Sequence, residues 1–133
     1  MLTPLLRRFL LDTNIVIALF AQEAGVLQQL QQAVGTFLPC IVLGELYYGA
    51  RKSGRAAANV QRVEDFASQN VVLPCDVETA QQYGIIKESL RAKGRPLPEN
   101  DIWIAALALQ HGLVLVSRDA HFNEIAGLTV AAW

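Results

Sequence analysis

Hydrophobic residues in this chain occur in short continuous runs that alternate with longer stretches of helical spacing. The short runs, typical of buried strands, cover residues 8–11, 36–39, 71–73, 113–117 and 128–131. Helical spacing covers residues 15–21, a stretch opened by Gly25, and then 41–52, 55–68, 77–93 and 99–110. Strands separated by helices of this length indicate parallel β-α-β units. We therefore expect an α/β fold, a three-layer α/β/α sandwich around a mostly parallel central sheet.

Length and composition fit one folded domain. The chain has 133 residues, and we expect 1–133 to form a single domain with one core. It is 53% hydrophobic and 17% charged, which excludes disorder. The net charge is -1, so bulk charge predicts no partner. A nucleic acid would have to be held by a local basic patch or through a metal.

The two cysteines and the N-terminal region add only negative information. Cys40 and Cys75 have no CxxC or Cys/His neighbours, so they suggest neither a zinc site nor a disulfide framework, and we expect small buried apolar residues. Arg7 and Arg8 precede apolar residues as in a signal peptide, but Asp12 and Asn14 interrupt that pattern. No apolar run approaches the roughly 18 residues of a membrane span. The simplest expectation is a cytoplasmic protein without a membrane segment.

Four acidic residues lie in apolar surroundings. Asp12 and Asp119 follow predicted strands, Glu45 lies on the helix after the second strand, and Asp101 opens a helix after a long loop. In an open parallel sheet, ligands collect beyond the carboxyl ends of the strands. All four side chains can reach this edge, so the pattern permits them to converge.

Each acid also has a purely structural interpretation. Asp12 is a good cap for the following helix, Asp101 complements a helix dipole, and Asp119 suits a turn or a cap. Glu45 is harder to explain in this way, because it lies in mid-helix among apolar residues. A structural role would require a buried cation, and the basic residues nearest to it, at positions 51 and 52, are six and seven places away.

A cluster of carboxylates needs protons or a cation. Two carboxylates about 5 Å apart repel by roughly 3 kcal/mol at an effective dielectric constant near 20. Oxygen ligands without His or Cys favour Mg²⁺ or Mn²⁺ over zinc. Such a site suits phosphodiester cleavage, because a metal lowers the pKa of an attacking water and neutralises charge on the phosphate.

Five blocks of sequence, in order, resemble those of PIN-domain ribonucleases of the VapC toxin type. They are Leu-Leu-Asp-Thr-Asn-Ile-Val at 10–16, Glu-Leu-Tyr-Tyr-Gly-Ala-Arg-Lys-Ser at 45–53, Tyr-Gly-Ile-Ile-Lys at 83–87, Asn-Asp-Ile-Trp-Ile-Ala-Ala at 100–106 and Leu-Val-Ser-Arg-Asp-Ala-His-Phe at 115–122. The resemblance implies a PIN domain and a Mg²⁺-dependent endoribonuclease, with Mn²⁺ as a substitute. It also implies a toxin, usually a homodimer, that a cognate antitoxin neutralises.

The resemblance also suggests roles for individual residues. Asp12, Glu45, Asp101 and Asp119 match the acidic positions of the family, with Asp12 and Asp101 as the expected direct metal ligands. Three polar positions, which support the acids or touch the scissile phosphate, match Thr13, Asn14 and Ser117. Candidate RNA contacts are Lys93, Arg95, Arg118 and His121, and a solvated helix end is an equal alternative for the first two.

The RNA substrate is not fixed by the sequence. Residues 83–133, with Gly127, Leu128 and Trp133, resemble the branch that cuts initiator tRNA. That branch often lacks an Asp at the fourth acidic position, where this chain has Asp119. A tRNA substrate is therefore one possibility among RNAs.

Three other classes of protein fit the sequence less well. A receiver-like Mg²⁺-binding signalling domain requires a Lys beyond its last strands, and this chain has none after Lys93. A dehalogenase-type phosphatase requires a second Asp two places after Asp12, where Asn14 stands. A catalytically silent PIN interaction module has no need of four intact acids. The sequence therefore favours the endoribonuclease.

Overall fold

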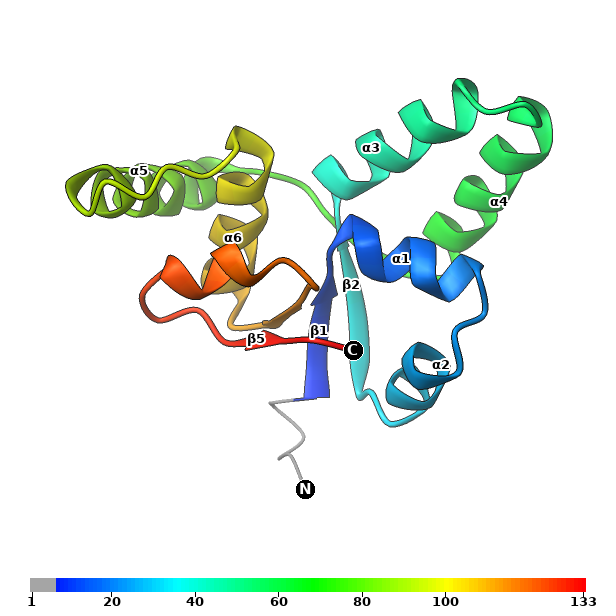
Figure 1. Ribbon diagram of the computed structural model, residues 1–133, viewed down its shortest axis with the longest axis horizontal. Coiled ribbons are helices and arrows are strands. Elements are labelled where there is room, and N and C mark those ends of the chain that lie inside the picture. The colour runs from blue at the N-terminus through cyan, green and yellow to red at the C-terminus, as the bar shows by residue number, and fades with distance from the viewer. Residues whose placement is uncertain (1–6) are drawn as a thin grey trace.

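A parallel five-stranded sheet lies at the centre of the protein (Figure 1). The computed structural model describes residues 7–133, and the strand order is β3-β2-β1-β4-β5. The strands are β1 (Arg8–Leu11), β2 (Gly35–Pro39), β3 (Val71–Leu73), β4 (Val114–Val116) and β5 (Val130–Ala131). Every neighbouring pair is parallel, as the alternation of strands and helices predicts.

Helices cover both faces of this sheet. They are α1 (Thr13–Phe20), α2 (Ala24–Gln31), α3 (Cys40–Arg51), α4 (Ala56–Ser68), α5 (Val77–Ala92) and α6 (Glu99–His111), with a short 3₁₀ helix η2 (Ala120–Glu124). Figure 1 shows α1, α2, α3 and α4 on one side of β1 and β2, and α5 and α6 on the other. The three-layer α/β/α sandwich is thereby confirmed.

The apolar runs of the sequence form the innermost strands. Leu10, Leu11 and Leu115 are fully buried, because β1 and β4 have helices on both faces. Asp12 begins α1 as its N-cap and accepts a hydrogen bond from the Thr13 backbone N–H. Gly112 ends α6 in a left-handed conformation, with φ of 63°.

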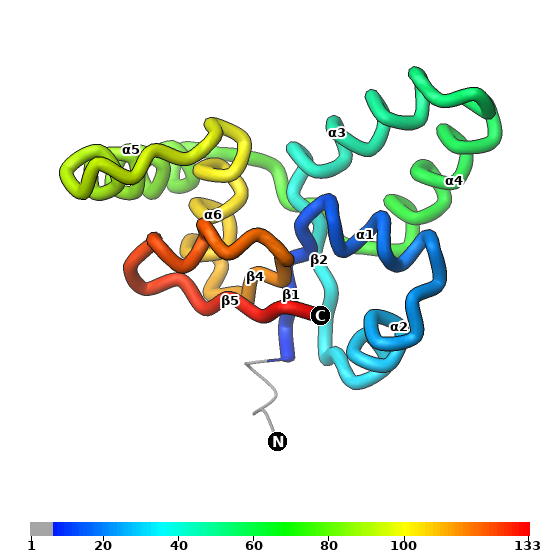
Figure 2. The backbone as a smooth tube through the Cα atoms, viewed as in Figure 1, coloured from blue at the N-terminus to red at the C-terminus, as the bar shows by residue number. Residues whose placement is uncertain are grey.

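The strand order reverses direction between β1 and β4. From β1 the chain moves outward through β2 to β3, and it then crosses back to place β4 and β5 on the opposite side of β1 (Figure 2). In open parallel sheets, a crevice for ligands opens at this point, outside the carboxyl ends of the two strands. Asp12 follows β1 and Ser117 follows β4, so the chain presents polar groups there.

The cysteines do not behave as predicted. Cys75 is exposed and Cys40 is half-buried, so the expectation of buried apolar residues is wrong. Pairing of Pro39 with Leu73 brings the ends of β2 and β3 together, and both thiols lie just beyond that edge. The pKa of Cys75 is raised to about 11, mainly by partial desolvation and to a smaller extent by the neighbouring Cys40 thiol. Within residues 7–133, no helix has the combined length and apolar character required to cross a membrane.

Candidate active site

Asp12 and Ser117 form the centre of the candidate site. The ends of β1 and β4 meet where the Asp12 backbone N–H donates to the Val116 carbonyl at 3.0 Å. Ser117 Oγ donates to Asp12 Oδ2 at 2.7 Å, and the exposed fractions of Asp12 and Ser117 are only 5% and 2%. Oδ1 of Asp12 accepts from the Thr13 backbone N–H at 2.8 Å. Both carboxylate oxygens are therefore held in place, and Asp12 is a helix cap as well as a candidate ligand.

Asn14 connects this centre to the loop after β4. Its Nδ2 lies 3.4 Å from both Asp12 Oδ2 and Ser117 Oγ, and its Oδ1 accepts from the Arg118 backbone N–H at 3.2 Å. The Asp119 backbone N–H donates to Ser117 Oγ at 3.1 Å. Asn14 and Ser117 therefore contact Asp12 directly through their side chains.

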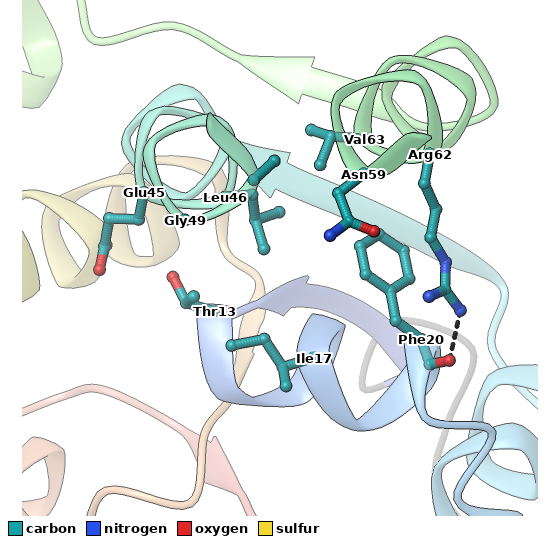
Figure 3. A pocket seen from close by; sticks show the side chains of 10 residues that line it. Thr13, Ile17, Phe20, Glu45, Leu46, Gly49, Asn59, Arg62 and Val63 are labelled. Atoms are coloured by element: carbon teal, nitrogen blue, oxygen red, sulfur yellow. Dashed lines mark hydrogen bonds between the residues drawn. The ribbon is translucent and has the colours of Figure 1, made fainter. Parts of the chain in front are cut away.

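Glu45 approaches the site from α3, but not from a buried position. The residues of α3 that enter the core are Val42, Leu46 and Ala50, four places apart. Glu45 lies one position before Leu46 and is exposed, so the expectation of a Glu enclosed by apolar residues is wrong. Its carboxylate faces the Thr13 hydroxyl across the gap between α3 and α1 (Figure 3).

The charge of Glu45 is disfavoured in this position. Partial desolvation raises its pKa above the usual value, the negative charge of Asp12 adds to this rise, and the Thr13 hydroxyl opposes it. Asp101 makes a further, smaller contribution in the direction of a higher pKa. Glu45 thus experiences the field of two other candidate acids.

Asp101 comes from the first turn of α6. Its side chain is only 17% exposed, and its Oδ2 lies 2.9 Å from Nε2 of His121 in η2. Desolvation raises the pKa of Asp101, and the charge of Asp12 raises it further. His121 opposes this rise, while the charge of Asp119 adds to it. Asp119 itself is exposed and precedes η2.

The structure therefore directs the four acids, from four parts of the chain, toward the same edge of the sheet. The charges of Asp12 and Asp101 act on Glu45, and the charges of Asp12 and Asp119 act on Asp101. Crowding of this kind raises carboxylate pKa values unless a cation is present. The structural interpretations of Asp12 and Asp101 also hold, because one caps α1 and the other lies in the first turn of α6.

The chemistry of the side chains fits a hard divalent cation. The donors are carboxylate oxygens, and Thr13 Oγ1 is a buried hydroxyl without a hydrogen-bond partner in the described part of the chain. As residues 7–133 are placed, no three His, Cys, Asp or Glu side chains are close enough together to hold a metal ion. The carboxylates would therefore have to move closer together around a cation.

Two of the basic residues predicted to contact RNA, Arg118 and Lys93, have partners within the protein, and the third, Arg95, is exposed. The Arg118 guanidinium donates to Glu23 Oε1 at 2.8 Å and to the Trp133 carbonyl at 2.9 Å. Lys93 Nζ donates to the Glu124 carbonyl at 2.7 Å. Figure 1 shows the C-terminal end of α5, which precedes Lys93, at the outer edge of the molecule. Each side chain keeps N–H donors that these bonds do not use, so an RNA contact would be made beside the existing partners or in exchange for them.

A groove beside the acids was missed by the sequence analysis. It lies between α1, α3 and α4, has a volume of about 340 Å³ and extends from Glu45 to Arg62 (Figure 3). Its walls are mainly apolar, formed by Ile17, Phe20, Leu46, Ala50 and Val63. The available signal was Ile17, an apolar residue of α1 that does not fit the buried stripe and is 56% exposed.

Together, the fold and the acidic edge define an α/β protein with a carboxylate site at the switch point of a parallel sheet. A sequence model of the PIN domain matches residues 9–128. The chain therefore belongs to the PIN-domain family, and the predicted resemblance is confirmed. This membership also removes the receiver-like signalling domain as an alternative.

Relatives of known function are nucleases. The chain is 36% identical over 129 residues to ribonuclease VapC2 of Haemophilus influenzae. The match covers 95% of this chain and 98% of the relative. It is 33% identical over 129 residues to the tRNA(fMet)-specific endonuclease VapC of Shigella flexneri, with the same coverage. PIN-domain VapC ribonucleases in general depend on a divalent metal.

Solved structures of VapBC complexes have a similar fold. The VapBC2 complex of Rickettsia felis, bound to a DNA fragment from its promoter, matches with a TM-score of 0.88 and 26% identity. The match covers 95% of this chain and 98% of the Rickettsia felis chain. DNA-bound VapBC of Salmonella typhimurium matches with a TM-score of 0.87 and 31% identity, again over 95% and 98% of the two chains. The PIN-like fold predicted from the resemblance is thus confirmed.

Proposed function

We propose that this chain is an endoribonuclease and the toxin of a toxin–antitoxin pair, and that it hydrolyses RNA phosphodiester bonds with Mg²⁺, for which Mn²⁺ can substitute. The observation that supports this most strongly is the acidic cluster at the switch point, with Asp12 buried at its centre. The ribonuclease relatives, which match 95% of the chain, support the reaction class.

In this proposal, Asp12 and Asp101 hold the cation directly, and Glu45 and Asp119 complete its surroundings. A divalent cation in this place neutralises charge on a phosphodiester and lowers the pKa of an attacking water. Ser117 and Asn14 fix Asp12 through the hydrogen bonds to Oδ2 at 2.7 Å and 3.4 Å. Thr13 faces Glu45, and its free hydroxyl can support the acids or contact the scissile phosphate.

Electrostatics supports this assignment. RNA and the acidic cluster are both negative, so the protein alone would repel its substrate at this edge. Desolvation, followed by the negative charge of Asp12, raises the pKa values of Glu45 and Asp101, so their charged forms are disfavoured in the protein alone. A doubly charged ion removes both difficulties, because it stabilises the carboxylates and attracts the phosphate.

For the substrate class, we propose RNA that includes tRNA. Two relatives, from Shigella flexneri and Salmonella typhimurium, are tRNA(fMet)-specific endonucleases. Sequencing of cleaved RNA ends after a short pulse of expression would test this proposal. It predicts ends concentrated in tRNA, with 5′-phosphate and 3′-hydroxyl groups, whereas ends spread over messenger RNA would contradict the tRNA assignment.

Replacement of Asp12 separates a nuclease from a silent PIN interaction module. Asp12→Asn keeps the cap acceptor but removes the charge, so we expect RNA cleavage to fall by about a hundredfold or more, equivalent to about 3 kcal/mol. Toxicity in cells should fall with it. Asp65→Asn is a matched control, because Asp65 is an exposed acid on α4. A D12N variant that cuts RNA as fast as the parent would contradict the proposed mechanism.

We also propose a cognate antitoxin as the protein partner, as in the VapBC complexes, with the apolar groove beside Glu45 as its docking surface. A segment in this groove would extend to the acids and could place a basic side chain among them. Displacement of Mn²⁺ on addition of antitoxin would support this arrangement.

A charged residue in the groove tests the docking surface. Ile17→Lys should abolish copurification of the antitoxin encoded beside the toxin, because Ile17 lines the groove. Val77→Lys is the control, since Val77 is 74% exposed at the start of α5, outside the groove. To keep the cells viable, both variants are made in the D12N protein. Equal copurification of the two variants would place the antitoxin elsewhere.

A further inference from the structure

One histidine meets a candidate metal ligand in the folded chain. His121 follows β4 in η2, and its Nε2 lies 2.9 Å from Oδ2 of Asp101 in α6. Nε2 is buried, and in the described part of the chain no hydrogen-bond partner of standard geometry satisfies it. The Asp101 carboxylate is thus the polar group that this nitrogen faces.

Packing fixes the imidazole in this position. Its ring lies 4.8 Å from that of Phe122, measured between centroids and tilted by 52°. Phe122 is fully buried and anchors η2 in the core. The His121 side chain retains only 35% exposure, and the ring edge that carries Nε2 is directed inward.

We propose that His121 is a positioning residue for the cation, holding the Asp101 carboxylate at Oδ2 so that Oδ1 can bind the ion; this inference rests on the proposed function. Carboxylate oxygens only accept hydrogen bonds, so this role requires the His121 tautomer that carries its hydrogen on Nε2. Groups in the outer shell of a metal site orient its carboxylate ligands in this way. In this proposal, the 2.9 Å contact of His121 with Asp101 serves the purpose that the Ser117 hydrogen bond serves for Asp12.

This assignment replaces the RNA contact expected for His121 with a different role. A residue that only contacts RNA would affect RNA binding and leave the affinity for a free cation unchanged. A residue that holds Asp101 affects the cation even when RNA is absent. Mn²⁺ binding to the purified, RNA-free and antitoxin-free protein therefore distinguishes the two roles.

Three substitutions at this position make the test specific. His121→Phe keeps an aromatic ring against Phe122 but removes both nitrogens. His121→Gln returns an N–H donor at a similar distance from the backbone, and His121→Ala removes the contact without adding bulk. The matched control is His111→Phe, because His111 is an exposed histidine at the end of α6.

Mn²⁺ affinity is measured by electron paramagnetic resonance titration of the full chain. We expect H121F and H121A to bind Mn²⁺ about tenfold or more weakly than the parent, as for other outer-shell groups. H121Q should recover most of the affinity, and H111F should match the parent. The Mn²⁺ concentration for half-maximal cleavage should rise in H121F, while the rate at saturating Mn²⁺ stays closer to that of the parent.

The outcomes separate this inference from the proposed function. If the parent binds Mn²⁺, D12N does not, and H121F and H121A bind it as tightly as the parent, the role of His121 is overturned and the proposed function stands. If the parent binds no Mn²⁺, or D12N binds it equally well, the proposed function itself fails. Loss of affinity in H121F with recovery in H121Q supports the assignment.

Discussion

At the scale of single residues, Asp12 combines a structural and a chemical role because its two oxygens have different partners. Oδ1 accepts from the Thr13 backbone N–H and starts α1, whereas Oδ2 accepts from Ser117 Oγ. The cap orients the carboxylate at the carboxyl end of β1, where the strand order reverses. Local folding and the candidate site thus depend on the same side chain.

The hydrogen bond from Ser117 should stabilise the fold measurably. Ser117→Ala leaves Asp12 Oδ2 buried without its 2.7 Å partner, so we expect the free energy of unfolding to fall by about 2 kcal/mol. Urea denaturation at neutral pH measures this change. Ser68→Ala is the control, because Ser68 makes an exposed hydrogen bond at the end of α4 and should change little. Equal changes in the free energy of unfolding of the two variants would mean that the buried hydrogen bond contributes no more to stability than the exposed one.

The raised pKa of Glu45 predicts how stability depends on pH in metal-free protein. Because this pKa lies above its usual value of 4.5, the folded state binds more protons than the unfolded state over the range between the two values. Stability therefore falls as the pH rises through that range. Glu45→Gln removes this loss, so its melting temperature should exceed that of the parent at neutral pH.

The difference between E45Q and the parent should disappear below the usual glutamate pKa, where both side chains are neutral. Thermal melts in chelator across this pH range provide the measurement. A parent that is more stable than E45Q at neutral pH would show that the Glu45 charge is compensated within the chain.

At the scale of elements, the sequence predicts strands well and the orientation of helices less well. Continuous apolar runs locate β1 and β3 to the residue. β1 is covered on both faces, as a central parallel strand should be, whereas β3 is an edge strand and Val71 is exposed. α1 begins at Thr13, two residues earlier than its apolar spacing indicates, because Thr13 and Asn14 form its first turn. The exposure of Glu45 was missed because neighbouring positions on a helix differ by about 100° in direction.

Contacts between distant elements account for the rest of what was missed. The convergence of the acids could be predicted, since strand ends share one edge. The ion pair of Arg118 with Glu23 and the contact of His121 with Asp101 could not, because η2 and the loops have no periodic pattern. The groove between α1, α3 and α4 likewise depends on how helices pack.

Two glycines, one at the end of α6 and one inside α5, provide a paired test of the helices. Gly112 has φ of +63° with open space where a Cβ would lie, so Gly112→Ala should cost about 1 kcal/mol of stability through backbone strain alone. Gly84 lies inside α5, also in open space, and Gly84→Ala should stabilise the protein by up to about 1 kcal/mol. Chemical denaturation of both variants measures the two signs. A stabilising G112A would contradict the left-handed end of α6.

At the scale of the whole molecule, a net charge of -1 gives RNA no general attraction. Recognition must then come from the site itself, where a cation would convert a repulsive edge into an attractive one. Exposed apolar residues such as Ile17, Tyr48 and Ile85 remain on the surface of the single chain. Partner chains would cover part of this exposed apolar surface.

The predicted homodimer gives one such partner. Light scattering coupled to size-exclusion chromatography should give a mass of twice 14.6 kDa for the toxin without its antitoxin. The inactive D12N variant makes enough protein for this measurement. A single species at 14.6 kDa over the accessible concentration range would contradict the homodimer.

The most direct test of the account is RNA cleavage by purified toxin in the presence of a chelator and after Mg²⁺ is restored, with the parent and D12N side by side. If the acidic edge acts through a divalent cation, the parent cuts only when Mg²⁺ is present, and D12N does not cut efficiently in either condition. Cleavage by the parent that persists unchanged in excess chelator would contradict the central claim that the acidic edge acts through a divalent cation.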